Sequence, residues 1–209
     1  MPRSNKLRWT AALLIALALP AVAQPPSTAS AVMAGALVSP GPSPTLGAAA
    51  HDYDWLIGGW DVQVTDYDGA GHAQSAHGEW YFSWVLDGRA VQDVWISPPR
   101  RERGPHAPAN NRYGTSLRVY DPALRAWRIT WENPQTGVHN ALIGRRQGKD
   151  IVQIGIDDDG RPIRWIFTDI RADSATWRGE KLQDDGSTWR LQALFRLERM
   201  RGGTAGPPR

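Results

Sequence analysis

Hydrophobic and polar residues alternate along most of the chain between residues 58 and 199, with the period of two that is typical of half-buried strands. The alternation begins at Trp60, Val62 and Val64, which are separated by polar side chains. No long segment shows the 3.6-residue period of a helix. The pattern predicts strands over residues 60–66, 79–86, 90–97, 113–120, 126–132, 138–145, 151–156, 162–170, 174–182 and 188–199.

Turn residues separate most of these strands at hairpin spacing, for example at Asp87-Gly88, Asp121-Pro122 and Asp185-Gly186. Short connections favour antiparallel neighbours, because parallel strands need long crossovers, and closing the sheet removes its unpaired edges. We therefore predict an all-β fold, a single antiparallel up-and-down β-barrel of about ten strands. A short helical turn over residues 51–56 is expected to plug one end.

The first residues have the form of a secretory signal peptide. Arg3, Lys6 and Arg8 precede an apolar run over residues 11–19, and Ala21-Val22-Ala23 is a small-residue cleavage site. The run is too short to cross a bilayer comfortably. We expect cleavage after Ala23 and a periplasmic or secreted bacterial protein, with an uncleaved anchor as the alternative.

The rest of the chain divides by composition. Residues 24–50 consist mainly of Pro, Ala, Ser, Gly and Thr without charge, which predicts a disordered linker. The barrel domain is expected over residues 51–201, followed by a disordered tail over 202–209. Within the barrel, the irregular stretch 97–112 contains four prolines and three arginines before Arg112 and is interpreted as a mobile excursion or a lid.

Charge and cysteine content exclude several function classes. The formal net charge is +3, but residues 51–201 contain 20 basic and 21 acidic side chains, so the folded part lacks the basic surface that nucleic acids require. The absence of cysteine excludes disulfides and thiolate-bound metals. The unusual number is 11 tryptophans, because large rings dominate both cores and ligand pockets.

Strand parity turns many of these rings toward the barrel interior, since successive side chains point to opposite faces. They form either a filled aromatic core or the wall of a cavity for a small hydrophobic or aromatic ligand. A barrel of about ten strands is wider than one of eight, which favours the cavity. The candidate ligand-binding residues are Trp80, Phe82, Trp84, Trp95, Trp127, Trp131, Trp165, Phe167 and Trp177.

Gly58-x-Trp60 on the first strand, with Arg199 at the end of the last, resembles the calycin signature shared by lipocalins and their relatives. The resemblance implies that Trp60 closes the base of the barrel and that Arg199 packs across it. Arg199 shares the predicted inward register of the alternation from Trp189 to Leu197, whereas Arg196 does not. Such a cation–π contact contributes about 0.5–2 kcal/mol.

Residues 52–199 as a whole resemble a bacterial lipocalin-like family of unknown function. The resemblance rests on the segments DYDWLIGGWDVQV, WVLDGRAVQDVW, GTSLRVYDPALRAWRITW and DDGSTWRLQALFRLERM. These motifs are structural, so the resemblance implies the fold and transfers no catalytic residue.

Few residues point to chemistry. Nitrobindin-like barrels of the same group bind haem through a histidine on a late strand. His139 is the only barrel-strand candidate in the second half of the domain, so haem is an alternative to the expected absence of a cofactor. The run Asp157-Asp158-Asp159-Gly160 lacks the spacing of a calcium loop and is interpreted as a hairpin turn, and no metal site is expected.

The sequence thus predicts an exported lipocalin-like protein that binds a small hydrophobic ligand in a Trp-lined cavity. One alternative is a barrel enzyme, an isomerase, cyclase or hydrolase, with Glu132, Asp93 or His139 as acid and base. The other is a ligand-free envelope interaction module with a solid core. Membrane spans after cleavage and nucleic-acid partners are not expected.

Overall fold

The computed structural model describes residues 28–103 and 111–201. The predicted signal peptide over residues 1–23 and the tail over 202–209 lie outside the described residues, as does 104–110 within the loop 97–112. No helix in the described part of the chain is long and apolar enough to cross a membrane.

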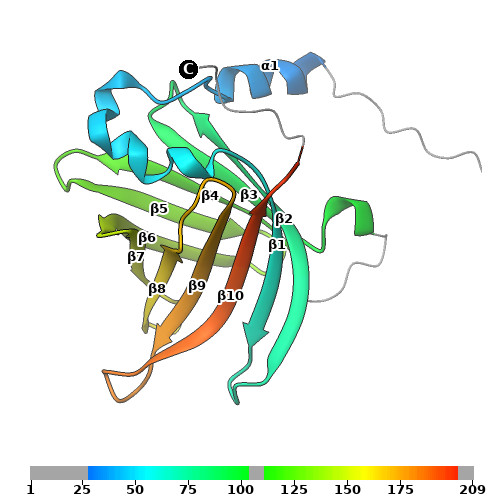
Figure 1. Ribbon diagram of the computed structural model, residues 1–209, viewed down its shortest axis with the longest axis vertical. Coiled ribbons are helices and arrows are strands. Elements are labelled where there is room, and N and C mark those ends of the chain that lie inside the picture. Colours follow the sequence, from blue (N-terminus) through cyan, green and yellow to red (C-terminus); the bar gives the residue numbers. More distant parts are fainter. Residues whose placement is uncertain (1–27, 104–110, 202–209) are drawn as a thin grey trace, which may run out of the picture.

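Ten strands form one closed antiparallel barrel in which each strand pairs with its neighbours in sequence, and the predicted fold class is confirmed (Figure 1). Short hairpins produce this order because each strand reverses directly into the next. The strands are β1 (Gly58–Tyr67), β2 (Ala73–Val85), β3 (Ala90–Ser97), β4 (Arg112–Asp121), β5 (Ala126–Asn133), β6 (Val138–Gln147), β7 (Asp150–Ile156), β8 (Pro162–Thr168), β9 (Ser174–Leu182) and β10 (Trp189–Arg199).

The barrel closes where the last strand pairs with the first, and β10 lies beside β1 in Figure 1. Trp60 is opposite Arg199 and Val64 is opposite Phe195 in this pairing. Their side chains share the inner face, so the two ends of the barrel domain jointly build the interior.

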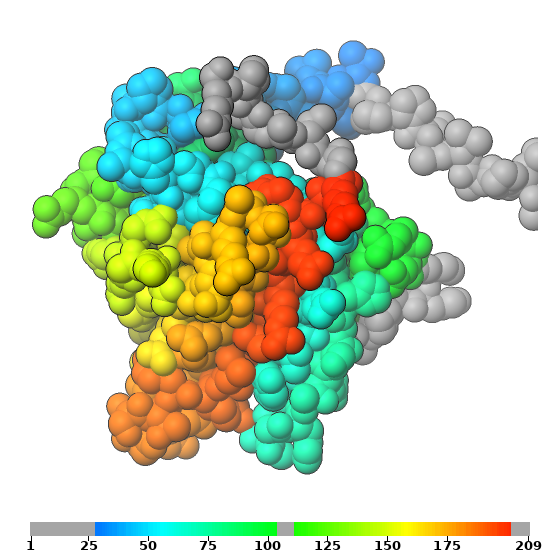
Figure 2. Space-filling view, in the orientation of Figure 1, coloured from blue at the N-terminus to red at the C-terminus, as the bar shows by residue number. Residues whose placement is uncertain are grey.

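A helical segment before β1 covers one end of the barrel (Figures 1 and 2). It contains the 3₁₀ helices η1 (Pro44–Asp52) and η2 (Asp54–Leu56), and Tyr53 and Leu56 are fully buried. Asp52 fixes it to the barrel by accepting hydrogen bonds from Trp127 Nε1 and Arg146 Nε, each at 2.9 Å. The predicted N-terminal helical turn is confirmed, and we call residues 44–57 the plug.

The described part of the predicted disordered linker is ordered instead. Residues 28–37 form helix α1 (Thr28–Leu37), and Leu46 and Ala50 in η1 belong to the buried core. The segment between them pairs with the β2–β3 hairpin, since Ser39 N donates to Trp84 O at 2.8 Å and Ser43 N donates to Gly88 O at 2.8 Å. Composition alone predicted disorder, since it does not show these backbone partners, which come from residues distant in sequence.

The inward register expected for the whole of β10 is wrong at its start. The pairing with β9 shifts between Leu191 and Ala193, which is the mark of a β-bulge. Before the bulge the faces exchange, and the Trp189 ring lies on the outer face, 4.2 Å from the Arg164 guanidinium carbon. One extra residue reverses the parity, and alternation in the sequence does not reveal it.

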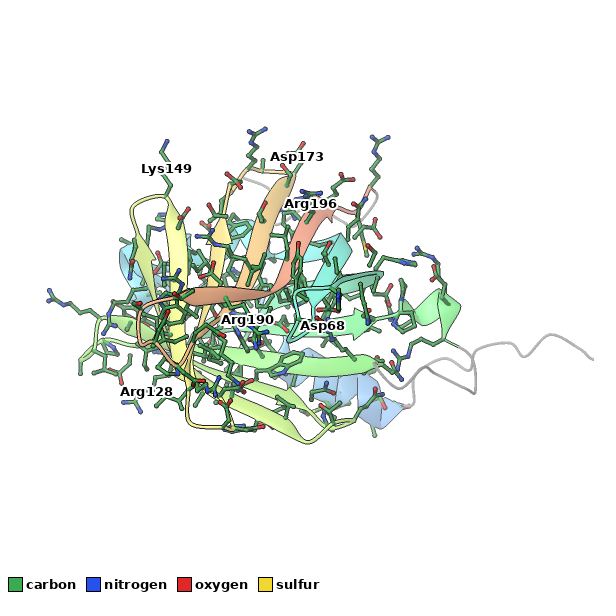
Figure 3. The ribbon with its side chains drawn as sticks, turned by 90° about the horizontal axis from the view of Figure 1, so that it is seen from below. Asp68, Arg128, Lys149, Asp173, Arg190 and Arg196 are labelled. Atoms are coloured by element: carbon green, nitrogen blue, oxygen red, sulfur yellow. The ribbon has the colours of Figure 1, made fainter. Side chains whose placement is uncertain are left out.

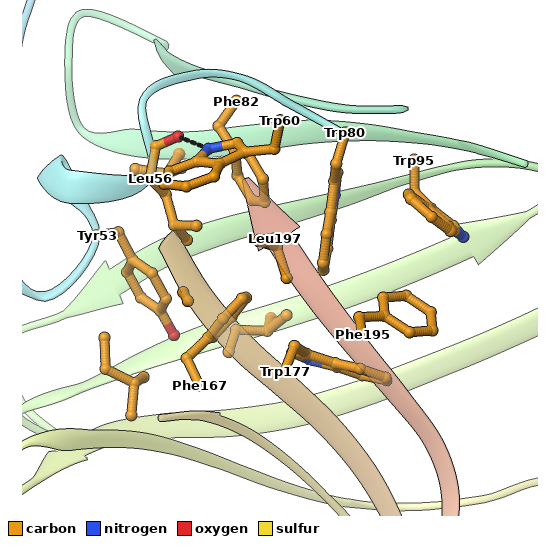
Figure 4. Close-up of a cluster of buried hydrophobic side chains, with 14 of the residues drawn as sticks. Tyr53, Leu56, Trp60, Trp80, Phe82, Trp95, Phe167, Trp177, Phe195 and Leu197 are labelled. Atoms are coloured by element: carbon orange, nitrogen blue, oxygen red, sulfur yellow. Dashed lines mark hydrogen bonds between the residues drawn. The ribbon is translucent and has the colours of Figure 1, made fainter. Parts of the chain in front are cut away.

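Arg199 closes the plugged end of the barrel. Its guanidinium carbon lies 4.2 Å from the centre of the Trp60 ring, and the group donates to the carbonyl oxygens of Ile57, Trp55 and Ala172 at 2.9, 2.6 and 2.8 Å. Trp60 Nε1 in turn donates to Leu56 O at 2.7 Å (Figure 4). The contact therefore joins β1, β10 and the plug.

Gly58 leaves room for this contact. Its φ is +120°, and a Cβ there would lie 3.1 Å from Arg199 Nη1, so both the backbone conformation and the space favour glycine. Arg196 points away from the barrel (Figure 3).

Replacing Arg199 by Lys is expected to lower the free energy of unfolding by about 1–3 kcal/mol, because an ammonium group does not reproduce the planar fork that bonds three carbonyls. The matched Arg196→Lys variant alters an exposed side chain and is expected to stay within about 0.5 kcal/mol. Urea unfolding of both variants measures the difference, and equal effects would contradict the closing role of Arg199.

Candidate functional site

The barrel interior is filled near the plug and hollow toward the other end. In Figure 4 the side chains of Tyr53 and Leu56 lie on the plug side, whereas Trp95, Phe195 and Trp177 lie farther along the barrel. A cavity of about 180 Å³ begins among the latter. It is lined by Asp66, Trp80, Trp95, Arg112, Ser116, Arg118, Trp131, Trp165, Trp177, Ala193 and Phe195.

Five of the nine predicted ligand-binding residues line this cavity, namely Trp80, Trp95, Trp131, Trp165 and Trp177. The other four, Phe82, Trp84, Trp127 and Phe167, are buried core residues that do not line it. Trp127 packs edge-on against Tyr53 of the plug, with ring centres 5.0 Å apart, and Phe167 packs edge-on against Trp55, with ring centres 5.5 Å apart. Parity identifies the inner face of a strand but not the depth along the barrel axis, which decides between core and cavity.

Aromatic contacts hold the cavity wall together. The Phe195 ring lies 4.5 Å from Trp177 and 4.9 Å from Trp95, and Trp80 lies 5.5 Å from Trp95. Phe195 was missing from the predicted lining, although its place in the β10 alternation marks it as inward. These neighbours fix the positions of the indoles, so the wall is preorganised.

Two inward glycines accommodate the indoles of neighbouring strands. A Cβ at Gly78 would lie 2.5 Å from Trp95 Cη2, and one at Gly114 would lie 2.5 Å from Trp131 Cη2. A side chain in either position would push a ring toward the barrel axis. The glycines therefore help to keep the central space open.

A buried ion pair lies beside the aromatic wall. Arg118 Nη1 donates to Asp93 Oδ2 at 2.5 Å, and the backbone N–H of Ser116 donates to Asp93 Oδ1 at 3.1 Å. Both charged side chains are almost fully buried. Asp93 was a predicted acid or base, but its carboxylate is paired with Arg118. Sequence reasoning did not select Arg118, although parity on β4 marks it as inward.

A second ion pair lies on the cavity wall nearer the open end, where Arg112 Nη2 is 2.9 Å from Asp66 Oδ2. The two residues belong to β4 and β1, which are not neighbours in the sheet. Both are about three-quarters buried. Sequence reasoning missed them because the pairing of distant strands is a property of the closed barrel.

The turn between β7 and β8 is a hairpin turn held by a lysine. Gly160 N donates to Asp157 O at 2.8 Å, and Lys181 Nζ lies 2.7 Å from Asp157 Oδ2 and 2.6 Å from Asp159 Oδ2. Burial raises the pKa of Asp157, but the hydrogen bond and charge of Lys181, together with hydrogen bonds from the Asp158 backbone and Asn140, outweigh burial and leave that pKa below its usual value. The hydrogen bond from Lys181 also lowers the pKa of Asp159.

Glu132 and His139, the other proposed acid and base, lie on the outer face of the barrel. The Glu132 side chain is 54% exposed and the His139 side chain is 55% exposed, and His139 Nδ1 is 2.6 Å from Glu132 Oε1. His139 therefore does not point into the interior, where a barrel-bound haem would need a ligand. Of the three candidate catalytic residues, only Asp93 faces inward.

Fold and site together define a calycin-like ten-stranded barrel with a small aromatic cavity. The S-type phycobiliprotein lyase CPES from Guillardia theta aligns with a TM-score of 0.51 at 9% identity, over 74% of this chain and 93% of the lyase. Rv2717c from M. tuberculosis aligns with a TM-score of 0.53 at 13% identity, over 77% of this chain and 99% of that protein. These similarities show the fold alone. No family model matches the chain, and no curated protein matches its sequence.

Replacing Asp93 by Ala is expected to cost about 3–5 kcal/mol of stability, because it leaves the buried Arg118 charge uncompensated. The double variant Asp93→Leu with Arg118→Met removes both charges and is expected to recover much of that loss. Chemical denaturation measures both, and a double variant less stable than Asp93→Ala would contradict this account of the pair.

Lys181→Gln is expected to lower stability most near neutral pH. The folded-state pKa values of Asp157 and Asp159 are lowered, so their stabilisation is present above the unfolded pKa of about 3.9 and is lost as the pH falls through the folded values. The folded-state pKa of Lys181 is raised, so the stabilisation from its charge is present below its usual pKa of 10.5 and is lost as the pH rises through the higher folded value.

Thermal unfolding at pH 7 and pH 2.5 tests this expectation. The difference in Tm between the native protein and Lys181→Gln should be smaller at pH 2.5 than at pH 7. Lys149→Gln, at an exposed lysine that points outward in Figure 3, is the control and should show no such change. A difference in Tm that is the same at both pH values would contradict the ionic role of Lys181.

Proposed function

We propose that this chain is an exported lipocalin-like protein that binds a small hydrophobic or aromatic molecule inside its barrel. The observation that carries the proposal is the cavity of about 180 Å³, whose wall includes five indoles and the ring of Phe195. A ring-lined space inside a rigid barrel matches the concave, largely apolar character of ligand sites.

The size of the cavity limits the ligand. Drug-sized ligands occupy pockets of about 300–1,000 Å³, whereas an apolar cavity of about 150 Å³ accepts benzene. A volume of about 180 Å³ therefore suits a molecule of one or two rings. Such a ligand would be held between flat indole faces, where each buried ring contact adds to the affinity.

The remaining parts of the proposal rest on the sequence. The signal-like pattern over residues 1–23 supports export to the periplasm or beyond, and the motifs from residue 52 onward support membership of the bacterial lipocalin-like family. In this function the protein binds its ligand without a resident cofactor, and the aromatic wall supplies the binding energy.

Replacing Trp165 by Ala is expected to weaken the binding of naphthalene about tenfold, because it removes one wall of the cavity. Isothermal titration calorimetry measures the affinity. Trp165 is only half-buried, so its stability loss should be smaller than that of a fully buried tryptophan.

Trp127→Ala is the matched control, since Trp127 is fully buried but does not line the cavity. Its stability is expected to fall by about 3–5 kcal/mol, with little change in the naphthalene affinity of the folded protein. Failure of the native protein to bind naphthalene, or equal loss of affinity in both variants, would overturn the proposed site.

A further inference from the structure

We infer that the natural ligand is an uncharged planar aromatic molecule that carries a carbonyl-type hydrogen-bond acceptor. The inference rests on the proposed function and adds the polar character of the ligand to its size. Three features of the cavity carry it: its unpartnered donors, the balance of its charges and its volume.

The cavity wall offers buried donors that have no acceptor. Among the described residues, Trp80 Nε1, Trp95 Nε1 and Arg118 Nε are buried without a hydrogen-bond partner, and all three residues line the cavity. These residues are 5%, 2% and 1% exposed. A buried donor without an acceptor costs about 1–3 kcal/mol, so a ligand that supplies an acceptor recovers part of this cost.

Among the described residues, no buried acceptor atom of the cavity lining lacks a hydrogen-bond partner. The two nearby carboxylates are already paired with guanidinium groups, Asp66 with Arg112 and Asp93, which does not itself line the cavity, with Arg118. Apart from Asp66, Ser116 has the only side chain in the described lining that can accept a hydrogen bond, and its hydroxyl serves as donor or acceptor. A ligand that only donates hydrogen bonds therefore finds few partners, whereas one that accepts them is complementary.

The charges of the site are balanced in pairs. Each guanidinium that lines the cavity has its own carboxylate, Arg112 at 2.9 Å from Asp66 and Arg118 at 2.5 Å from Asp93. An anionic ligand would add an uncompensated negative charge to this interior, and burial of an unpaired charge is costly. The donors thus favour a neutral acceptor such as the oxygen of a ketone, lactone or amide over a carboxylate.

The volume sets the scale of the probe. Coumarin has two fused planar rings with a lactone carbonyl, naphthalene has the same ring size without an acceptor, and cinnamate has the same number of non-hydrogen atoms as coumarin but carries a charge. The three compounds separate ring contacts, hydrogen bonding and charge within one size class.

Isothermal titration calorimetry of the three probes against the native protein is the test. Coumarin is expected to bind about tenfold more tightly than naphthalene, which corresponds to one recovered hydrogen bond, and more tightly than cinnamate. Trp95→Phe, which keeps a ring but removes the N–H, is expected to weaken coumarin about fivefold and naphthalene less than about twofold.

Trp177→Phe is the control, because Trp177 also lines the cavity but its N–H is not one of the unpartnered buried donors of the described residues. It should weaken coumarin and naphthalene by the same factor. Circular dichroism establishes that each variant is folded before titration.

The outcomes distinguish the two levels of the proposal. If naphthalene binds and coumarin binds no better, the acceptor inference fails while the proposed binding function stands. Tighter binding of cinnamate than of coumarin would overturn the uncharged character of the ligand. If none of the three probes binds, the proposed function fails and the inference falls with it.

Discussion

The pairing of β1 with β10 is the interaction on which the rest of this structure depends. Closure turns the inner faces of all strands toward one enclosed space, so every second side chain must either fill it or line it. Arg199 reinforces closure at the plugged end, where it lies on Trp60 and bonds the carbonyls of Ile57 and Trp55. The same group ties the first strand, the last strand and the plug together.

The plug divides the interior into two parts with different physical roles. Tyr53 and Leu56 enter the barrel from one end and meet a filled aromatic core. Beyond that core the rings of Trp80, Trp95 and Phe195 line the wall and leave a small space. The inward rings thus form a solid core near the plug and the wall of a cavity toward the other end.

The polar groups of the interior explain how a largely apolar barrel accommodates charge. Arg118 and Asp93 are buried as a pair, and Arg112 and Asp66 form a second pair nearer the opening. Pairing lets these groups remain in a space that is otherwise aromatic. Among the described residues, the Nε1 donors of Trp80 and Trp95 have no acceptor, so the cavity wall carries directional polarity as well as apolar surface.

The sequence by itself determined the strands, their antiparallel order and the inward rings, because alternation with a period of two and hairpin turns are local properties of the chain. The Gly58-x-Trp60 motif also pointed to Arg199 as the residue that lies across the base. Depth along the axis was not local, so Phe82, Trp84, Trp127 and Phe167 were assigned to the cavity although they belong to the core.

Only the tertiary structure decided the remaining features, because each depends on residues far apart in sequence. The bulge after Leu191 turned Trp189 to the outer face, and pairing with the β2–β3 hairpin ordered the segment around Ser43. The Arg112–Asp66 pair exists because closure brings β4 and β1 around the same space. Local pattern set the faces of the strands, and closure of the barrel set which side chains meet.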